Sequence, residues 1–133
     1  MSTKNILIVD DDQHLILGLS PRLKSSGYSV VSATDAISAI AVTRKETPDL
    51  VILDLGLPAG DGYLVMERLK DLIGQPAAPI IVLSARDPVD NRQRSMNAGA
   101  VAFFQKPPDN REFMTAVRDA LGETTALSTF LMT

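Results

Sequence analysis

Three carboxylates, one hydroxyl and one ammonium follow short apolar runs of this sequence. Asp10 and Asp11 follow one run, Asp54 and Ser84 follow two others, and Lys106 lies just past a fourth. Clustered carboxylates repel one another unless a cation neutralises them. Oxygen ligands without histidine or cysteine favour Mg²⁺ or Mn²⁺, with waters completing an octahedron. A carboxylate nucleophile, a metal, an ammonium and a hydroxyl donor together meet the requirements for forming an aspartyl phosphate.

The run that precedes Asp54 predicts how these groups are positioned. Leu50 to Leu53 contains no polar break, which is typical of a strand buried on both faces of a helix-covered parallel sheet. Pro58, Gly60 and Gly62 follow, so the chain leaves the strand as a loop. We therefore expect Asp54 at the carboxyl end of a central strand, facing the crevice where open α/β sheets bind ligands.

Strand-like and helix-like patterns alternate along the rest of the chain. Four further strands are predicted at residues 6–9, 28–32, 80–83 and 101–104. Apolar residues at helical spacing predict five helices, with patterns that begin near Leu15, Ile37, Leu64, Val89 and Phe113. This alternation predicts an α/β fold, a doubly wound five-stranded parallel sheet with helices on both faces. The strand-end residues then meet at one edge of the sheet.

Two of the predicted helices have unusual features. Pro21 falls inside the first helix, where it should kink the helix or cost about 3 kcal/mol. The segment from Pro88 to Ala98 is polar, with Val89, Met96 and Ala98 as its only apolar anchors. Such sparse anchoring is typical of a segment that shifts at low energetic cost.

Length and composition limit the classes of protein to consider. A chain of 133 residues fits one domain, which we place at residues 1–121, with a tail at 122–133 that is docked, a linker or disordered. The absence of cysteine excludes disulfides and thiolate metal sites. No signal-peptide layout or membrane-spanning apolar stretch occurs, so a cytoplasmic protein is expected. A net charge of -3 provides no basic footprint for direct nucleic-acid binding.

Four motifs together resemble the receiver domain of two-component response regulators. They are Val9-Asp10-Asp11, Asp54-x-x-x-Pro58-x-x-Asp61-Gly62, Leu83-Ser84-Ala85 and Lys106-Pro107. Each is weak alone, but all four occur in the right order at predicted strand ends. The resemblance covers about residues 4 to 121 and implies a flavodoxin-like sheet in the order 2-1-3-4-5.

The resemblance also implies a phosphoacceptor and a metal site. Asp54 matches the aspartate that takes a phosphoryl group from a sensor histidine kinase or a phosphotransfer protein. Asp11 matches the acid that ligates Mg²⁺ (or Mn²⁺) directly, and Asp10 matches its neighbour, which acts through water. Asp54 itself and the backbone carbonyl of Gly56 match the other protein ligands.

A switch is implied by the same resemblance. Lys106 matches the lysine that pairs with the phosphoryl oxygens, and Ser84 the hydroxyl that moves onto them. Phe103 matches an aromatic residue that swings inward, although a core role fits it equally well. Arg86 is expected to cover part of the phosphoryl group. A new dianion accepts hydrogen bonds and so stabilises donors that turn toward it. We therefore expect the surface formed by the fourth helix, the fifth strand and the final helix to change. The partners to test are the kinase or phosphotransfer protein, a downstream target or output domain, and a second copy of the chain in a homodimer.

Other polar residues have simpler interpretations. Asp12 is expected to cap a helix rather than to bind metal, and Asp61 to hold a turn. His14, the only histidine, lies at a helix start and lacks the exposed helical site of a phosphotransfer histidine. Arg92 and Arg94 are interpreted as a solvated helix face rather than a docking patch.

Two other classes of function compete with a phosphorylation-controlled signalling module, which has no small-molecule substrate to turn over. The first is a Mg²⁺-dependent phosphatase with an aspartate nucleophile, similar to the haloacid-dehalogenase-like enzymes. That class needs a second aspartate where this chain has Gly56, and a cap for which the chain has no room. The second is a receiver-like binding scaffold that is not phosphorylated. Loss of an acid or of Lys106 would favour the scaffold, and all of them are present.

Overall fold

A computed structural model describes residues 3–58, 61–72 and 78–123 of the chain. Strands and helices alternate throughout this part, and each apolar run of the sequence forms a strand. The elements are β1 Asn5–Val9, α1 Gln13–Ser25, β2 Ser29–Ala33, α2 Ala36–Glu46, β3 Leu50–Leu53, α3 Gly62–Lys70, β4 Ile80–Ser84, α4 Pro88–Asn97, β5 Ala102–Gln105 and α5 Asn110–Ala120. None of these helices is long and apolar enough to cross a membrane.

The strands form one five-stranded sheet in the order β2-β1-β3-β4-β5, and every pairing is parallel. This result confirms the predicted doubly wound fold and its strand order. The ladder hydrogen bonds continue past the strand ends, where the backbone N–H groups of Asp54 and Lys106 donate to the carbonyls of Val9 and Ser84 at 2.9 and 2.8 Å. The backbones of Asp54 and Lys106 are therefore hydrogen-bonded to the sheet.

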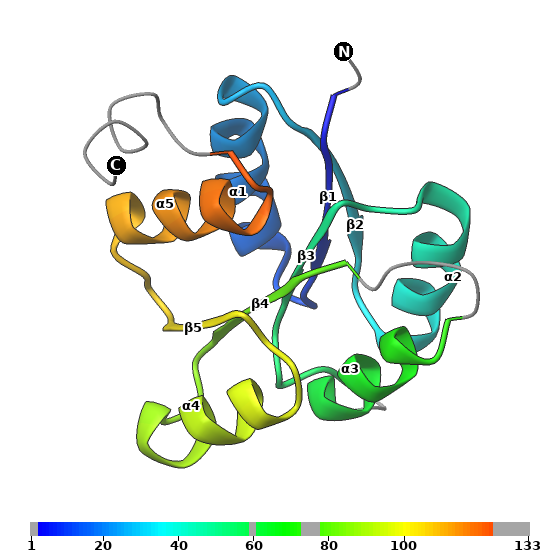
Figure 1. The fold of residues 1–133 in the computed structure, drawn as a ribbon, viewed down its shortest axis with the longest axis vertical. Coiled ribbons are helices and arrows are strands. Elements are labelled where there is room, and N and C mark those ends of the chain that lie inside the picture. Colours follow the sequence, from blue (N-terminus) through cyan, green and yellow to red (C-terminus); the bar gives the residue numbers. More distant parts are fainter. Residues whose placement is uncertain (1–2, 59–60, 73–77, 124–133) are drawn as a thin grey trace.

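Helices cover both faces of the sheet, α1 and α5 on one and α2, α3 and α4 on the other (Figure 1). Alternate residues of each strand point to opposite faces. Ile6, Ile8 and Ile52 pack with α1 and α5, whereas Val9 and Leu53 belong to the core beneath α2 and α3. A sheet buried on both faces explains why the central strands lack polar residues.

Four apolar residues of the predicted helix patterns, Met96 among them, are exposed, which corrects the prediction of buried stripes. Ile37 is 84% exposed, Leu64 41% and Val89 87%. Ile37 lies two positions from the buried Ala39 of α2, and Leu64 two positions from the buried Met66 of α3. Because two positions rotate a side chain by about 200° around a helix, these residues face away from the core.

Every helix begins after an aspartate whose side chain accepts a backbone N–H of the first turn. The predicted cap at Asp12 is confirmed, and Asp61, expected to hold a turn, caps α3. Asp35, Asp87 and Asp109 cap α2, α4 and α5. A carboxylate at this position satisfies an otherwise unpaired donor and interacts favourably with the helix dipole. These aspartates thus have structural roles, in contrast to the acids at the strand ends.

Removing one of these caps should destabilise the domain in a pH-dependent way. The hydrogen bond from the Ser38 backbone lowers the pKa of Asp35 below its usual value, so its stabilisation is present at neutral pH and is lost as pH falls through the lowered pKa. We expect Asp35→Ala to lower the melting temperature at pH 7 and to differ less from the wild type in acid. Thermal unfolding over this pH range measures the difference. Asp35→Asn, which keeps the acceptor, is the control, and equal losses in both variants would contradict the capping role.

Some predicted features differ in detail or are not covered by the structure. Helix α1 continues through the exposed Pro21 to Ser25, so this proline does not end the helix. The last strand begins at Ala102 rather than at Val101, which is 51% exposed. Gly60, Gly74 and residues 124–133 lie outside the described residues, and the arrangement of the tail stays a prediction.

Candidate functional site

The three strand-end acids lie together at the carboxyl edge of the sheet, as predicted. Asp10, Asp11 and Asp54 each place a carboxylate oxygen within 4.8 Å of those of the other two. Asp10 and Asp54 are buried, with 2% and 7% exposure, whereas Asp11 is exposed. Asp10 and Asp54 directly follow the paired strands β1 and β3, and this pairing brings together residues that are 44 positions apart.

Lys106 supplies the positive charge of the cluster. Its Nζ lies 2.8 Å from Oδ2 of Asp10 and 3.6 Å from Oδ2 of Asp54. The other oxygen of Asp10 accepts the backbone N–H of Asp12 at 2.9 Å. Both oxygens of Asp10 therefore have hydrogen-bond partners. The peptide bond between Lys106 and Pro107 is cis.

Burial and charge alter the proton affinities of the Asp10–Lys106 pair. Burial raises the pKa of Asp10, and the hydrogen bonds from Lys106 and Asp12, which favour the carboxylate, offset this only in part. Burial alone would lower the pKa of Lys106. The hydrogen bond to Asp10 and the negative charges of Asp10 and Asp54 outweigh burial, so the pKa of Lys106 is raised. Lys106 is accordingly charged at neutral pH and faces more than one carboxylate.

The composition of the cluster fits a hard divalent cation. Among the described residues, three carboxylates gather here and one ammonium contacts two of them, which leaves excess negative charge at the edge of the sheet. All of the ligand atoms are oxygens, the donors that Mg²⁺ prefers. Two oxygens on opposite sides of an octahedral Mg²⁺ lie about 4.2 Å apart, which agrees with the 4.8 Å limit within which the three carboxylates meet. Asp10, Asp11 and Asp54 could thus hold such an ion.

Ser84 lies at the end of β4, fully buried, in the strand next to β3. Its Oγ accepts the backbone N–H of Arg86 at 3.2 Å. The side chain of Arg86 reaches across the loops, and its guanidinium lies 3.5 Å from Asp61 at the start of α3. This ion pair links the loop after Ser84 to the loop after Asp54. The Arg86 side chain, which we expected from the sequence to cover part of the phosphoryl group, therefore pairs with Asp61 in this structure.

Two glycines lie against Asp54. A Cβ at Gly56 would lie 3.8 Å from Oδ2 of Asp54, so residue 56 lies beside the carboxylate but places no side chain against it. A Cβ at Gly62 would lie 2.6 Å from both the carbonyl oxygen of Asp54 and the Cα of Leu55. Gly62 also donates its N–H to the carbonyl of Leu55 at 3.0 Å. The start of α3 therefore packs directly on the backbone that carries Asp54.

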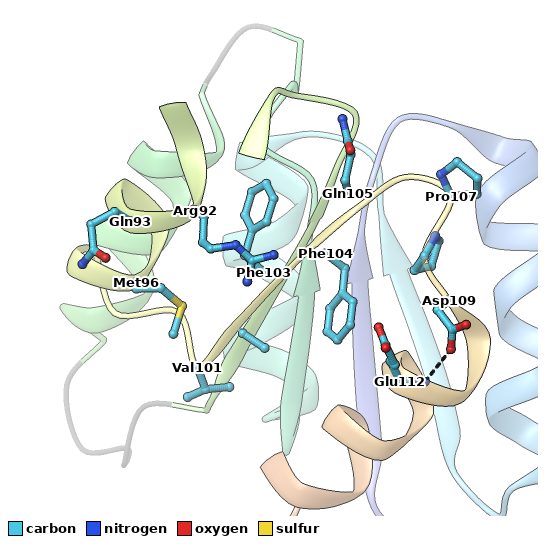
Figure 2. Close-up of a pocket in the computed structure, with 12 residues that line it drawn as sticks. Arg92, Gln93, Met96, Val101, Phe103, Phe104, Gln105, Pro107, Asp109 and Glu112 are labelled. Carbon is cyan, nitrogen blue, oxygen red and sulfur yellow. Dashed lines mark hydrogen bonds between the residues drawn. The ribbon is translucent and has the colours of Figure 1, made fainter. Parts of the chain in front are cut away.

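Phe103 lies in the core rather than on the surface. It is 3% exposed and belongs to the cluster beneath α2 and α3. The Arg92 guanidinium lies 5.6 Å from the centre of its ring (Figure 2). The neighbouring Phe104 points to the opposite face of the sheet and packs edge-on against Phe113, with 5.4 Å between the ring centres. The core role of Phe103 is thus present in this structure, and its role as a switch stays a prediction.

The two arginines of α4 interact with aromatic rings, a feature that the sequence patterns did not predict. Arg92 and Arg94 are partly or fully exposed, consistent with a solvated helix face, but Arg94 also lies 3.8 Å from the ring centre of Tyr63. The hydroxyl of Tyr63 donates to Oδ1 of Asn91 at 2.8 Å. The one sequence feature that points to Tyr63 is that it directly follows Gly62, the last residue of the motif that begins at Asp54. His14 is exposed at the second residue of α1.

Comparisons with known proteins agree with this fold. The family model described as "Response regulator receiver domain" matches residues 6–118. Transcriptional regulatory protein KdpE of Mycobacterium tuberculosis is 36% identical over 121 residues, which cover 91% of this chain and 52% of that protein. The chain therefore spans about half the length of the curated relatives that it matches.

Solved structures show the same similarity. The response regulator receiver domain protein (CheY-like) of Methanospirillum hungatei matches with a TM-score of 0.80 and 32% identity, over 91% of this chain and 95% of that one. The BeF3-activated N-terminal receiver domain of Klebsiella pneumoniae RstA matches with a TM-score of 0.81 and 29% identity, over 89% and 98%. The fold, the acidic site and these matches define a regulatory domain of two-component signalling. This chain belongs to the response regulator receiver domain family.

Proposed function

We propose that Asp54 accepts a phosphoryl group from a sensor histidine kinase or a phosphotransfer protein. In this step an oxygen of Asp54 attacks phosphorus and the phosphorus–nitrogen bond of the donor phosphohistidine breaks. The donor ring, which carries a proton on its other nitrogen, leaves as neutral imidazole. The single observation that supports this proposal is the buried Asp54 carboxylate beside Asp10, Asp11 and Lys106 at the edge of the sheet. The domain would catalyse only its own phosphorylation and dephosphorylation.

We assign the residues of the site as follows. Asp11, Asp54 and the Gly56 carbonyl would hold Mg²⁺ directly, and Asp10 through water, since both Asp10 oxygens already accept hydrogen bonds. When bound, Mg²⁺ would offset the negative charge that builds up on the phosphoryl oxygens during transfer. Lys106 would pair with one of these oxygens through the ammonium that now contacts Asp10 and Asp54.

The buried Ser84 hydroxyl and the aromatic ring of Phe103 would respond to the new dianion. The response would reach an open groove of about 600 Å³ between α4 and α5, lined by Arg92, Met96, Phe104 and other residues (Figure 2). A downstream target, a covalently attached output domain or a second copy of the domain would read this surface. Similarity to transcriptional regulators supports a cytoplasmic location and an output in gene control.

The competing functions have less support. A phosphatase with an aspartate nucleophile lacks its second acid here, because Gly56 occupies that position. A binding scaffold would not need Asp10, Asp11, Asp54 and Lys106 to converge as they do. The relatives described above, which match most of this chain, are a transcriptional regulator and receiver domains of response regulators.

A labelling experiment tests the proposal. We expect the chain to gain the mass of one phosphoryl group when it is incubated with acetyl phosphate and Mg²⁺, because Asp54 then attacks phosphorus and acetate leaves. The intact mass of the protein measures the gain. Chelation of the metal should prevent the gain, and labelling that is independent of Mg²⁺ would contradict the assignment of the metal site.

The role of Lys106 is tested by stability and metal affinity together. Lys106→Met leaves Asp10 facing Asp54 without a cation, so the free energy of unfolding without metal should fall by about 1.5–3 kcal/mol at pH 7. Mg²⁺ should bind the variant at least as tightly as the wild type, since a competing cation is gone. Denaturant unfolding with and without Mg²⁺ measures both effects.

The pH dependence of the Lys106 variant has a definite sign. A raised lysine pKa stabilises the fold below its unfolded value, and this contribution is lost as pH rises through the folded pKa. The difference between Lys106→Met and the wild type should therefore shrink in alkali. Lys45→Met, at an exposed position in the last turn of α2, is the control. An equal loss in the control would show that the Asp10 contact is not the cause.

A further inference from the structure

Helix α4 is held in place by contacts with neighbouring aromatic residues rather than by a buried apolar stripe. Ser95 is the only buried residue among those of α4, and its hydroxyl has no hydrogen-bond partner in the described part of the chain. Val89 and Met96, the anchors predicted from the sequence, are 87% and 39% exposed. Few apolar groups of its own therefore resist a shift of this helix.

Tyr63 makes the polar connection between α3 and α4. Its hydroxyl donates to Oδ1 of Asn91 at 2.8 Å, and the amide nitrogen of Asn91 donates to the carbonyl of Asp87 at 3.0 Å. Asp87 is the N-cap of α4, so the hydroxyl is tied to the first turn of that helix. Arg94, one turn further along, lies 3.8 Å from the ring centre of Tyr63, a cation–π contact.

The residue before Tyr63 packs on the backbone of Asp54. Gly62 precedes Tyr63 and lies so close to Asp54 that a Cβ would be 2.6 Å from the Asp54 carbonyl oxygen. Gly62 also donates its N–H to the carbonyl of Leu55. Close-packed contacts of this kind transmit displacement because they have little free volume. We therefore expect a shift of the Asp54 backbone to displace Tyr63.

We propose that Tyr63 is a positioning residue that couples the state of Asp54 to helix α4. The route leaves the site through Gly62 and α3, and it reaches α4 separately from the contact between Arg92 and Phe103 of β5. The inference rests on the proposed function, because it needs Asp54 to exist in two states. A change at one site is felt at another only if contacts between them differ in the two states.

Hydrogen–deuterium exchange tests this coupling in the full chain. Tyr63→Phe removes the hydroxyl that binds Asn91 and keeps the ring beneath Arg94. The wild type and the variant are each treated with acetyl phosphate and Mg²⁺. Intact mass then measures labelling, and deuterium uptake is followed at the start of α3 and in α4.

We expect the Tyr63→Phe variant to be labelled to the same extent as the wild type. The start of α3 should respond to labelling as in the wild type, whereas the change in uptake across α4 should fall by about threefold or more, as expected for one lost hydrogen bond. Asn91→Ala removes the acceptor instead of the donor and should give the same result. It also serves if Tyr63→Phe does not fold.

Tyr28→Phe is the matched control, because Tyr28 is the other tyrosine of the chain and is buried beside α1 and α5. It should leave the response of α4 unchanged. A wild-type response of α4 in both Tyr63→Phe and Asn91→Ala, or an α4 that does not respond in the wild type, would overturn the inference. A wild-type chain that takes no phosphoryl group would overturn the proposed function and the inference with it. Normal labelling with an unaltered α4 response in the variants overturns the inference alone.

Discussion

The Asp54→Asn variant is expected to gain no phosphoryl group from acetyl phosphate and Mg²⁺. An amide has nearly the size and shape of the carboxylate but is not a competent nucleophile toward phosphorus. The fold should survive, since the substitution keeps the volume of a side chain that is 7% exposed and removes one of three mutually repelling charges. Intact mass after incubation measures the result, and the expected effect is complete loss of labelling.

A second acid in the same connection provides the control for Asp54→Asn. Asp61 caps α3 and lies at the exposed end of the loop that follows β3. Asn is as good a cap as Asp, so Asp61→Asn keeps the start of the helix and loses only the exposed ion pair with Arg86. This variant should be labelled like the wild type. Equal labelling of Asp54→Asn and Asp61→Asn would show that another residue is the acceptor.

The Gly62→Ala variant is expected to lose about 1–3 kcal/mol of unfolding free energy. Its new methyl group would lie 2.6 Å from two backbone atoms, the carbonyl oxygen of Asp54 and the Cα of Leu55. Neither belongs to a flexible side chain that can move aside, so the start of α3 or the Asp54 loop must shift. This steric cost exceeds the gain of up to about 1 kcal/mol that alanine normally brings to a helix. Urea unfolding measures the loss.

Gly18→Ala is the matched control for Gly62→Ala, because Gly18 lies within α1 and a Cβ added there would meet nothing within 4 Å. The same chemical change should therefore stabilise the protein there, by about 0.5–1 kcal/mol. Opposite signs at the two glycines would support the packing argument. A stabilising Gly62→Ala would show that the backbone of Asp54 yields easily, and would remove the mechanical basis for coupling through α3.

The sequence predicts the site well because the sheet is parallel. All strands of such a sheet end at the same edge, so a residue that ends an apolar run is placed without knowledge of any tertiary contact. Asp10, Asp54, Ser84 and Lys106 can be located in this way, and the structure brings the acids and the lysine together. The helix caps are also predictable, because a cap is a local interaction within four residues.

Contacts between helices could not be predicted in the same way. Tyr63 and Asn91 are 28 residues apart, and their hydrogen bond depends on how α3 and α4 lie beside each other. Neither residue breaks a periodic pattern, so neither attracts attention in the sequence. The exposed Ile37 and Val89 show the related difficulty that an apolar residue near a helix start need not face the core. Tertiary packing decides the orientation in each case.

Chemical mapping of the modified residue distinguishes Asp54 from every other candidate phosphoacceptor of the chain. Borohydride reduces an aspartyl phosphate to homoserine, so reduction of the labelled chain followed by peptide sequencing by mass spectrometry identifies the modified residue. We expect homoserine at position 54 in the Mg²⁺-treated sample and unmodified aspartate there when the metal is chelated. Homoserine at Asp10, Asp11 or any other position, with Asp54 intact, would contradict it.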